Sequence, residues 1–203
     1  MPGSPSRSRV PRWLPQALAI GLAIGPAAEL ALRFSLEGFG ADPIEAGMHR
    51  TGESGLRLLL LSLTVTPLRR LFGWSALAPL RRTLGLAAFV YACLHLLTWA
   101  ALEHALDGAA ILEDVTERPY VMAGLGAFAL LSPLALTSTR RWMKRLGPRW
   151  VRLHRLVYLA AILAVVHHFW LVKADYGPPL VHAAWLAALL GARIPWWLRS
   201  RRG

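Results

Sequence analysis

Three histidines lie inside stretches of sequence that are otherwise apolar and long enough to form helices: His95, His154 and His167. An ionisable side chain at the depth of a membrane is costly, and it usually faces the interior of a helical bundle and marks a functional site. Histidine is also a common axial ligand of haem iron. Two such histidines that face each other across a bundle would make the chain an electron carrier.

The composition indicates one integral membrane domain. Of the 203 residues, 55% are hydrophobic, and the mean hydropathy is +0.42. The formal charge of +12 comes from basic residues in short clusters between apolar stretches, which favours a membrane protein and argues against a nucleic-acid partner. The single cysteine, Cys93, excludes a disulfide framework and an iron–sulfur cluster held by thiolates.

We expect an all-α fold, a polytopic membrane helical bundle with about six transmembrane helices. A spanning helix needs about 20 mostly apolar residues. The candidate spans are 13–35, 54–68, 84–104, 119–138, 152–173 and 178–198. The first resembles a signal peptide, but five further spans follow it, so a retained helix is preferred. The chain then divides into a cytoplasmic segment, 1–12, a six-helix transmembrane domain, 13–198, and a cytoplasmic tail, 199–203.

The charged residues predict the orientation of these spans. Basic residues cluster before the first span, after the second, after the fourth and after the sixth, as in Arg7, Arg9, Arg12, Arg69, Arg70, Arg81, Arg82, Arg140, Arg141, Lys144, Arg145, Arg149, Arg152, Arg199, Arg201 and Arg202. Every acidic residue except Glu29 lies in the other connections. Because basic residues stay on the cytoplasmic side, both termini are expected in the cytoplasm.

This topology places two of the histidines at similar depth. The third and fifth spans both run outward, so His95 and His167 should lie in the outer half of the bilayer, the geometry for two ligands of one haem. His154 is thirteen residues before His167, about 20 Å of helical rise, and marks an inner site. A matching inner histidine would lie near residue 82, where Arg81 and Arg82 stand instead. The inner site is thus open to a haem with a different partner, another cofactor or no group.

The remaining histidines are less informative. Around the helix axis, His168 lies about 40° from His154, and His167 lies about 140° from it. If both sites use one face of the helix, this angle (the azimuth) alone favours His168 as the outer ligand. His49, His104 and His182 lie in or near the outer connections, where we expect interfacial or solvated side chains. A proton relay is a rival interpretation of the buried histidines. It would require acidic residues within the spans, and only Glu29 qualifies.

The order and spacing of several short segments resemble one known family. The segments are Gly40-Ala41-Asp42-Pro43 with His49 and Thr51-Gly52, Leu63-Thr64-Val65-Thr66-Pro67-Leu68, Arg81-Arg82-Thr83-Leu84-Gly85-Leu86, Leu94-His95-Leu96, Arg118-Pro119-Tyr120, Leu136-Thr137-Ser138-Thr139, and the stretch from Leu146-Gly147 through Trp150, Leu153-His154, Val157-Tyr158, His167 and Trp170 to Lys173. They are similar to the haem-binding membrane subunits of the bacterial protein-methionine-sulfoxide reductase system. That family lies within the ferric-reductase-like transmembrane group.

The resemblance implies haem b, one group or two, with iron ligands at His95, His154 and His167, and it selects His167 over His168. It also implies FMN, although the sequence has no glycine-rich loop for its phosphate. The expected protein is a multi-pass electron-transfer subunit of the bacterial inner membrane, not the catalytic subunit.

The same resemblance implies partners on both sides of the membrane. Electrons would come from the quinone pool or a cytoplasmic flavin reductase and pass to a periplasmic molybdenum-cofactor enzyme that reduces methionine sulfoxide. The acidic outer connections offer a docking surface for that subunit, formed by Glu103, Asp107, Glu113, Asp114 and Glu117.

Two alternatives remain open at this point. One is a transmembrane component of the ferric-reductase type with another acceptor, which would need a nucleotide-binding domain or a separate reductase; we expect no such domain in this chain. The other is a non-redox proton-coupled transporter, which an absence of bound haem would favour. Related bundles serve different acceptors, so kinship of fold does not decide between them.

Overall fold

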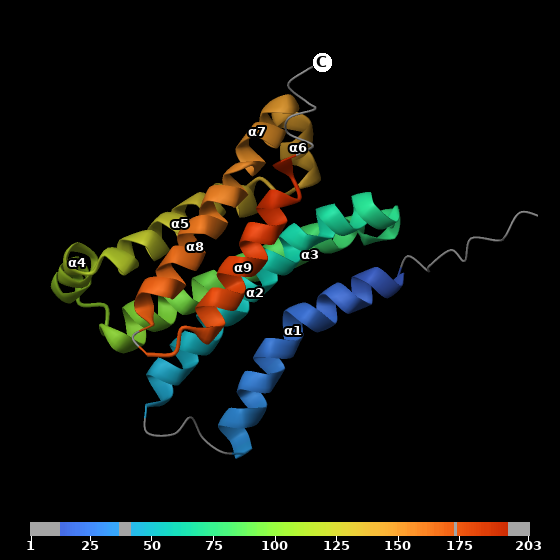
Figure 1. Ribbon diagram of the computed structural model, residues 1–203. Helices are drawn as coiled ribbons and strands as arrows, with labels where there is room; N and C mark the ends of the chain where they lie inside the picture. The colour runs from blue at the N-terminus through green and yellow to red at the C-terminus, as the bar shows by residue number, and fades with distance from the viewer. Residues whose placement is uncertain (1–12, 37–41, 173, 195–203) are drawn as a thin grey trace, which may run out of the picture.

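The computed structural model describes residues 13–36, 42–172 and 174–194, and every long regular element in these ranges is a helix (Figure 1). The helices are α1 (Trp13–Leu36), α2 (Pro43–Phe72), α3 (Ala78–Leu97), α4 (Gly108–Glu117), α5 (Pro119–Leu136), α6 (Arg140–Leu146), α7 (Pro148–His154), α8 (Leu156–Leu171) and α9 (Gly177–Gly191). A short 3-10 turn, Ser75–Leu77, precedes α3, and a π-helical turn, η2 (Thr98–Glu103), follows it. The all-α prediction is confirmed.

Four stretches of the described chain are long and apolar enough to cross a membrane: Trp13–Arg33, Ala78–Glu103, Pro119–Leu136 and Pro148–Leu171. They coincide with the first, third, fourth and fifth predicted spans. The second predicted span lies within α2, where Arg57, Arg69 and Arg70 leave a shorter apolar stretch between them. The sixth coincides with α9, whose 15 residues rise about 22 Å. The predicted cytoplasmic segments 1–12 and 199–203 lie outside the described residues, as does 195–198, the end of the sixth predicted span.

Two helical hairpins form the centre of the molecule. One consists of α2 and α3, which are joined by a left-handed Gly73 and the 3-10 turn; the other pairs α5 with α8 (Figure 1). Small residues let the backbones approach, as at Gly55, where an added Cβ would lie 3.4 Å from the carbonyl oxygen of Ala88. Their shared core is apolar and contains Leu58, Leu59, Leu60, Leu63, Leu84, Ala88, Tyr91, Leu131, Ala160, Ala161 and Val165.

The remaining helices surround these hairpins. The first helix, α1, packs on α3 and α2, and the hydroxyl of Tyr91 donates a hydrogen bond to the carbonyl of Ala23 at 3.0 Å. The last, α9, packs on α8 and α2, and the indole of Trp185 donates to the hydroxyl of Thr64 at 3.1 Å. The short helix α4 packs on the start of α5 (Figure 1). The two hairpins contact each other through α3 and α5 and through α2 and α8.

Candidate functional site

The structure brings the rings of His95 on α3 and His167 on α8 close together. Their ring centroids are 6.0 Å apart, and the ring planes are inclined at 76°. Both rings line one cavity, whose walls are largely apolar and include Leu56, Leu59, Ala88, Phe128 and Leu131. The structure therefore brings together the two histidines that the sequence predicts as a pair.

The same nitrogen of each ring is bound to a backbone carbonyl of the neighbouring helix. Nδ1 of His95 lies 2.9 Å from the carbonyl oxygen of Met48, and Nδ1 of His167 lies 2.7 Å from that of Tyr120. A carbonyl can only accept, so each Nδ1 carries the proton and donates it. The unprotonated Nε2 is then the atom that can bind a metal. Bonds of this kind commonly fix the orientation of metal-binding histidines.

Glycine makes both of these approaches possible. Gly52 lies four residues after Met48, and Gly124 lies four residues after Tyr120, so each glycine is stacked directly above the accepting carbonyl. A Cβ at Gly52 would lie 2.9 Å from Nδ1 of His95, and one at Gly124 would lie 2.8 Å from Nδ1 of His167. Any larger residue would force the imidazole away from its acceptor.

The two arrangements are copies of one another along the chain. Glycine, accepting carbonyl and histidine recur with the same spacing in the two hairpins, and each element of the second lies 72 residues after its counterpart in the first. Ala88 and Ala160, both buried, keep the same spacing. The site is thus built by two equivalent hairpins that each supply one histidine.

This geometry fits a planar metal-bearing group between the rings. Two imidazoles that share one metal at bonds of about 2 Å have centroids about 6 Å apart, because each centroid lies about 1 Å behind its nitrogen. No group of three or more His, Cys, Asp or Glu within the described ranges could hold a metal ion by itself. The remaining ligands would therefore come from a cofactor, as the four nitrogens of haem do.

His154 occupies a separate place at the far end of α7. Its ring stacks on Trp150 with centroids 3.8 Å apart, and its Nδ1 lies 3.2 Å from the carbonyl oxygen of Trp150. Its Nε2 is buried and has no hydrogen-bond partner among the described residues. It lines a second cavity together with Arg81 and Arg82. Arg82 stands 72 residues before His154, so the repeat places an arginine where a second histidine would be needed.

His168 does not face His95. Its ring lies against that of His182 on α9, with centroids 5.3 Å apart. His182 is only 4% exposed, so the expectation of a solvated side chain was wrong. Nε2 of His168 and Nδ1 of His182 are buried without a hydrogen-bond partner in the described part of the chain. The azimuth argument that favoured His168 in the outer pair does not match this arrangement.

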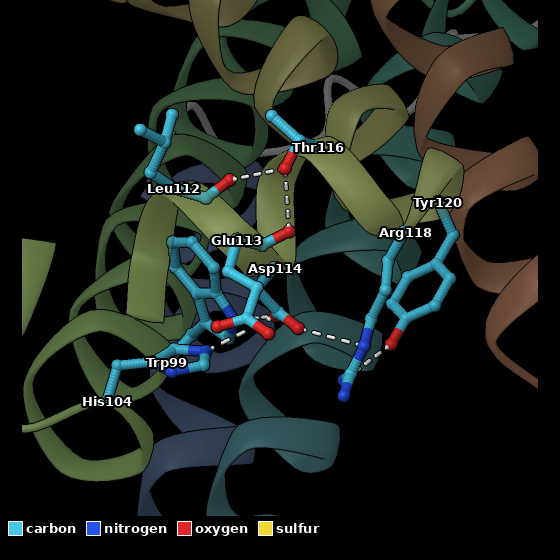
Figure 2. Close-up of polar contacts among 8 residues, drawn as sticks. All are labelled: Trp99, His104, Leu112, Glu113, Asp114, Thr116, Arg118 and Tyr120. Carbon is cyan, nitrogen blue, oxygen red and sulfur yellow. Dashed lines mark hydrogen bonds and ion pairs between the residues drawn. The ribbon is translucent and has the colours of Figure 1, made fainter. Parts of the chain in front are cut away.

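A polar cluster that the sequence did not predict lies among the residues that line the first cavity (Figure 2). The carboxylate of Asp114 is 7% exposed. It accepts from the indole of Trp99 at 3.2 Å, faces Nε2 of His104 at 3.3 Å and pairs with Nε of Arg118 at 2.8 Å. Asp114 therefore does not belong to an exposed acidic docking surface, and His104 is not a solvated side chain.

Arg118 extends this cluster to the second hairpin. Its Nη1 donates to the hydroxyl of Tyr120 at 3.1 Å, and the backbone of Tyr120 is the acceptor for His167 (Figure 2). The hydrogen bond to Tyr120 and the nearby carboxylate of Asp114 raise the pKa of Arg118 above its ordinary value. The guanidinium thus stays charged.

Comparisons with known proteins agree with this architecture. Residues 51–165 match the family model described as "Ferric reductase like transmembrane component". A protein of Rhodospirillum rubrum is 48% identical over 171 residues, which cover 84% of this chain and 82% of the relative. A protein of Xanthomonas axonopodis pv. citri is 43% identical over 185 residues, 88% of this chain and 85% of the relative.

Both relatives bear the name protein-methionine-sulfoxide reductase heme-binding subunit MsrQ. A model match over more than half of the chain, together with this identity over most of both sequences, goes beyond a shared fold. The chain belongs to the MsrQ family of the ferric reductase-like transmembrane proteins.

Proposed function

We propose that this chain is a haem b-containing electron-transfer subunit of a methionine sulfoxide reductase system in a bacterial inner membrane. The observation that carries the proposal is the pair His95 and His167, which face each other with both Nδ1 atoms bound to carbonyls. In this proposal Nε2 of each ring would hold the haem iron. The group would supply one-electron transfer when bound.

The residues of the chain have separate tasks in this function. His95 and His167 hold the group, while the carbonyls of Met48 and Tyr120 keep the rings in one tautomer and one orientation. The largely apolar walls of the cavity suit a large apolar cofactor. His154 is proposed to hold a second group nearer the opposite membrane face.

The proposal includes a donor and an acceptor. Electrons come from the quinone pool or a cytoplasmic flavin reductase and pass to a periplasmic molybdenum-cofactor subunit that reduces methionine sulfoxide in oxidised proteins. The names of the relatives support membership in such a system. The bundle is proposed to span the membrane six times with both termini in the cytoplasm, with α2 and α9 completing the four clearly apolar spans.

Removal of either outer ligand tests the haem assignment. His95→Ala and His167→Ala are expected to abolish the low-spin b-type spectrum of this site, because each removes one axial ligand. His49→Ala and His168→Ala are the controls and should retain it. The measurement is the visible spectrum of the purified protein, oxidised and reduced, with a pyridine haemochrome count. Equal haem content in all four variants would refute His95 and His167 as haem ligands. A haem-free wild type would favour the transporter alternative.

The glycines provide a second test that leaves the histidines in place. Gly52→Ala and Gly124→Ala are expected to lower the haem bound at the outer pair to near background, since the new Cβ displaces an imidazole from its carbonyl. Gly85→Ala is the matched control on α3, because its Cβ would meet the hydroxyl of Ser62 at an ordinary 3.5 Å. Wild-type spectra in both site variants would show that the carbonyl contacts do not position the ligands.

The role of His154 is tested with the catalytic partner present. His154→Ala should slow the reduction of the outer group by a quinol or a cytoplasmic flavin reductase, while the spectrum of the outer pair and its reoxidation by the periplasmic subunit remain. The reason is that an intermediate carrier between the donor and the outer pair shortens each electron-transfer step. Wild-type reduction kinetics in this variant would refute a relay role for His154.

The proposed topology has its own test. A green fluorescent protein fused to the C-terminus should fluoresce, and alkaline phosphatase inserted after Asp107 should be active, because the first lies in the cytoplasm and the second in the periplasm. Insertion of the phosphatase after Gly147 is the control and should give an inactive reporter. The reverse pattern of activities would overturn the orientation.

A further inference from the structure

The buried carboxylate of Asp114 connects both sides of the histidine pair, although it touches neither ring. Among the described residues its contacts are Trp99 of the π-helical turn, His104 at the end of that turn and Arg118 at the junction of α4 and α5 (Figure 2). A buried carboxylate is costly unless it is paired and hydrogen-bonded, so Asp114 stays buried only while these contacts are made. Two of them lead to the two histidines.

The first connection runs through Trp99. This residue lies four positions after His95, one helical turn further, at the start of the π-helical turn η2. Its indole N–H donates to Asp114 at 3.2 Å, and its ring lies edge-on to His104 with centroids 5.0 Å apart. The end of α3 that bears His95 is thereby attached to α4.

The second connection runs through Arg118 and Tyr120. Tyr120 is the second residue of α5, and α5 begins without a side-chain cap. The first turn of an uncapped helix is the part that frays most readily. Here the hydroxyl of Tyr120 is bound by Arg118, and Arg118 is held in turn by Asp114. The carbonyl that orients His167 therefore belongs to a helical turn that this cluster restrains.

We propose that Asp114 is a positioning residue for the pair His95 and His167. It fixes the spacing and angle of the two rings through Trp99 on one side and through Arg118 and Tyr120 on the other. It also places a negative charge beside the cavity that both rings line. This inference rests on the proposed haem ligation, and the residue acts on the group only through its ligands and its charge.

Two measurable properties follow from such a role. A negative charge near haem stabilises the oxidised iron, which carries one more positive charge, and so lowers the reduction potential. The mutual angle of the two imidazole planes sets the electron paramagnetic resonance signature of a low-spin haem. A residue that only stabilised the outer connection would alter neither property in protein that still binds haem.

The test compares Asp114→Asn with wild-type protein of equal haem content. The variant keeps the shape of the side chain and removes its charge, so the reduction potential of the outer haem should shift to a more positive value, and the resonance signals should shift or broaden. Thr116→Val is the matched control. It also removes a polar contact of α4, since the Thr116 hydroxyl donates to the carbonyls of Leu112 and Glu113 at 3.0 Å, but that contact is local to α4 (Figure 2).

Single-connection variants keep the inference testable if Asp114→Asn does not fold. Trp99→Phe and Tyr120→Phe each remove one connection without changing a charge, so they should alter the resonance signals and leave the potential nearer that of the wild type. Wild-type potential and signals in Asp114→Asn, or wild-type signals in both single-connection variants, would overturn the positioning role. A wild-type protein without low-spin haem would instead refute the proposed function.

Discussion

The arrangement of the whole bundle depends on one constraint: an imidazole in an apolar environment must have its N–H satisfied. In each hairpin a backbone carbonyl of the partner helix meets this requirement. A helical carbonyl already accepts the hydrogen bond of its own helix, and the side chain four residues later normally blocks a second donor. Gly52 and Gly124 have no side chain, so the imidazoles can reach the carbonyls of Met48 and Tyr120. The close packing of α2 on α3 and of α5 on α8 is therefore a condition of the site as well as of the fold.

The sequence predicted the outer pair because depth in a membrane follows from position along an apolar helix. His95 and His167 needed only the direction of their spans and the rise per residue. The azimuth alone favoured His168, whereas the ring that lies 6.0 Å from that of His95 belongs to His167, and the reason is local. The helix is interrupted at Arg155, between α7 and α8, where Tyr158 N–H bonds to the carbonyl of Arg155 three residues earlier. An angle counted from His154 at a constant 100° per residue does not carry across that turn.

Other parts of the site depend on which helices are neighbours, and periodicity does not give this. Gly52 and Gly124 resemble many small residues of membrane helices until the facing histidine is known. The clearest hidden signal was the 72-residue spacing, which relates His95 to His167 and Gly52 to Gly124. Asp114 lies in a polar connection, where a solvated side chain is the ordinary expectation. It is buried because η2 and α4 fold together around it.

The repeat also explains why the two ends of the bundle differ. At the end that carries His95 and His167, both hairpins supply a histidine. At the other end His154 and Arg82 line the second cavity, and an arginine side chain has no lone pair to give a metal. Arg81 and Arg82 add positive charge there, and none of the described residues that line that cavity is acidic. A group held at His154 would therefore lie in an electropositive pocket, which would favour its reduced state.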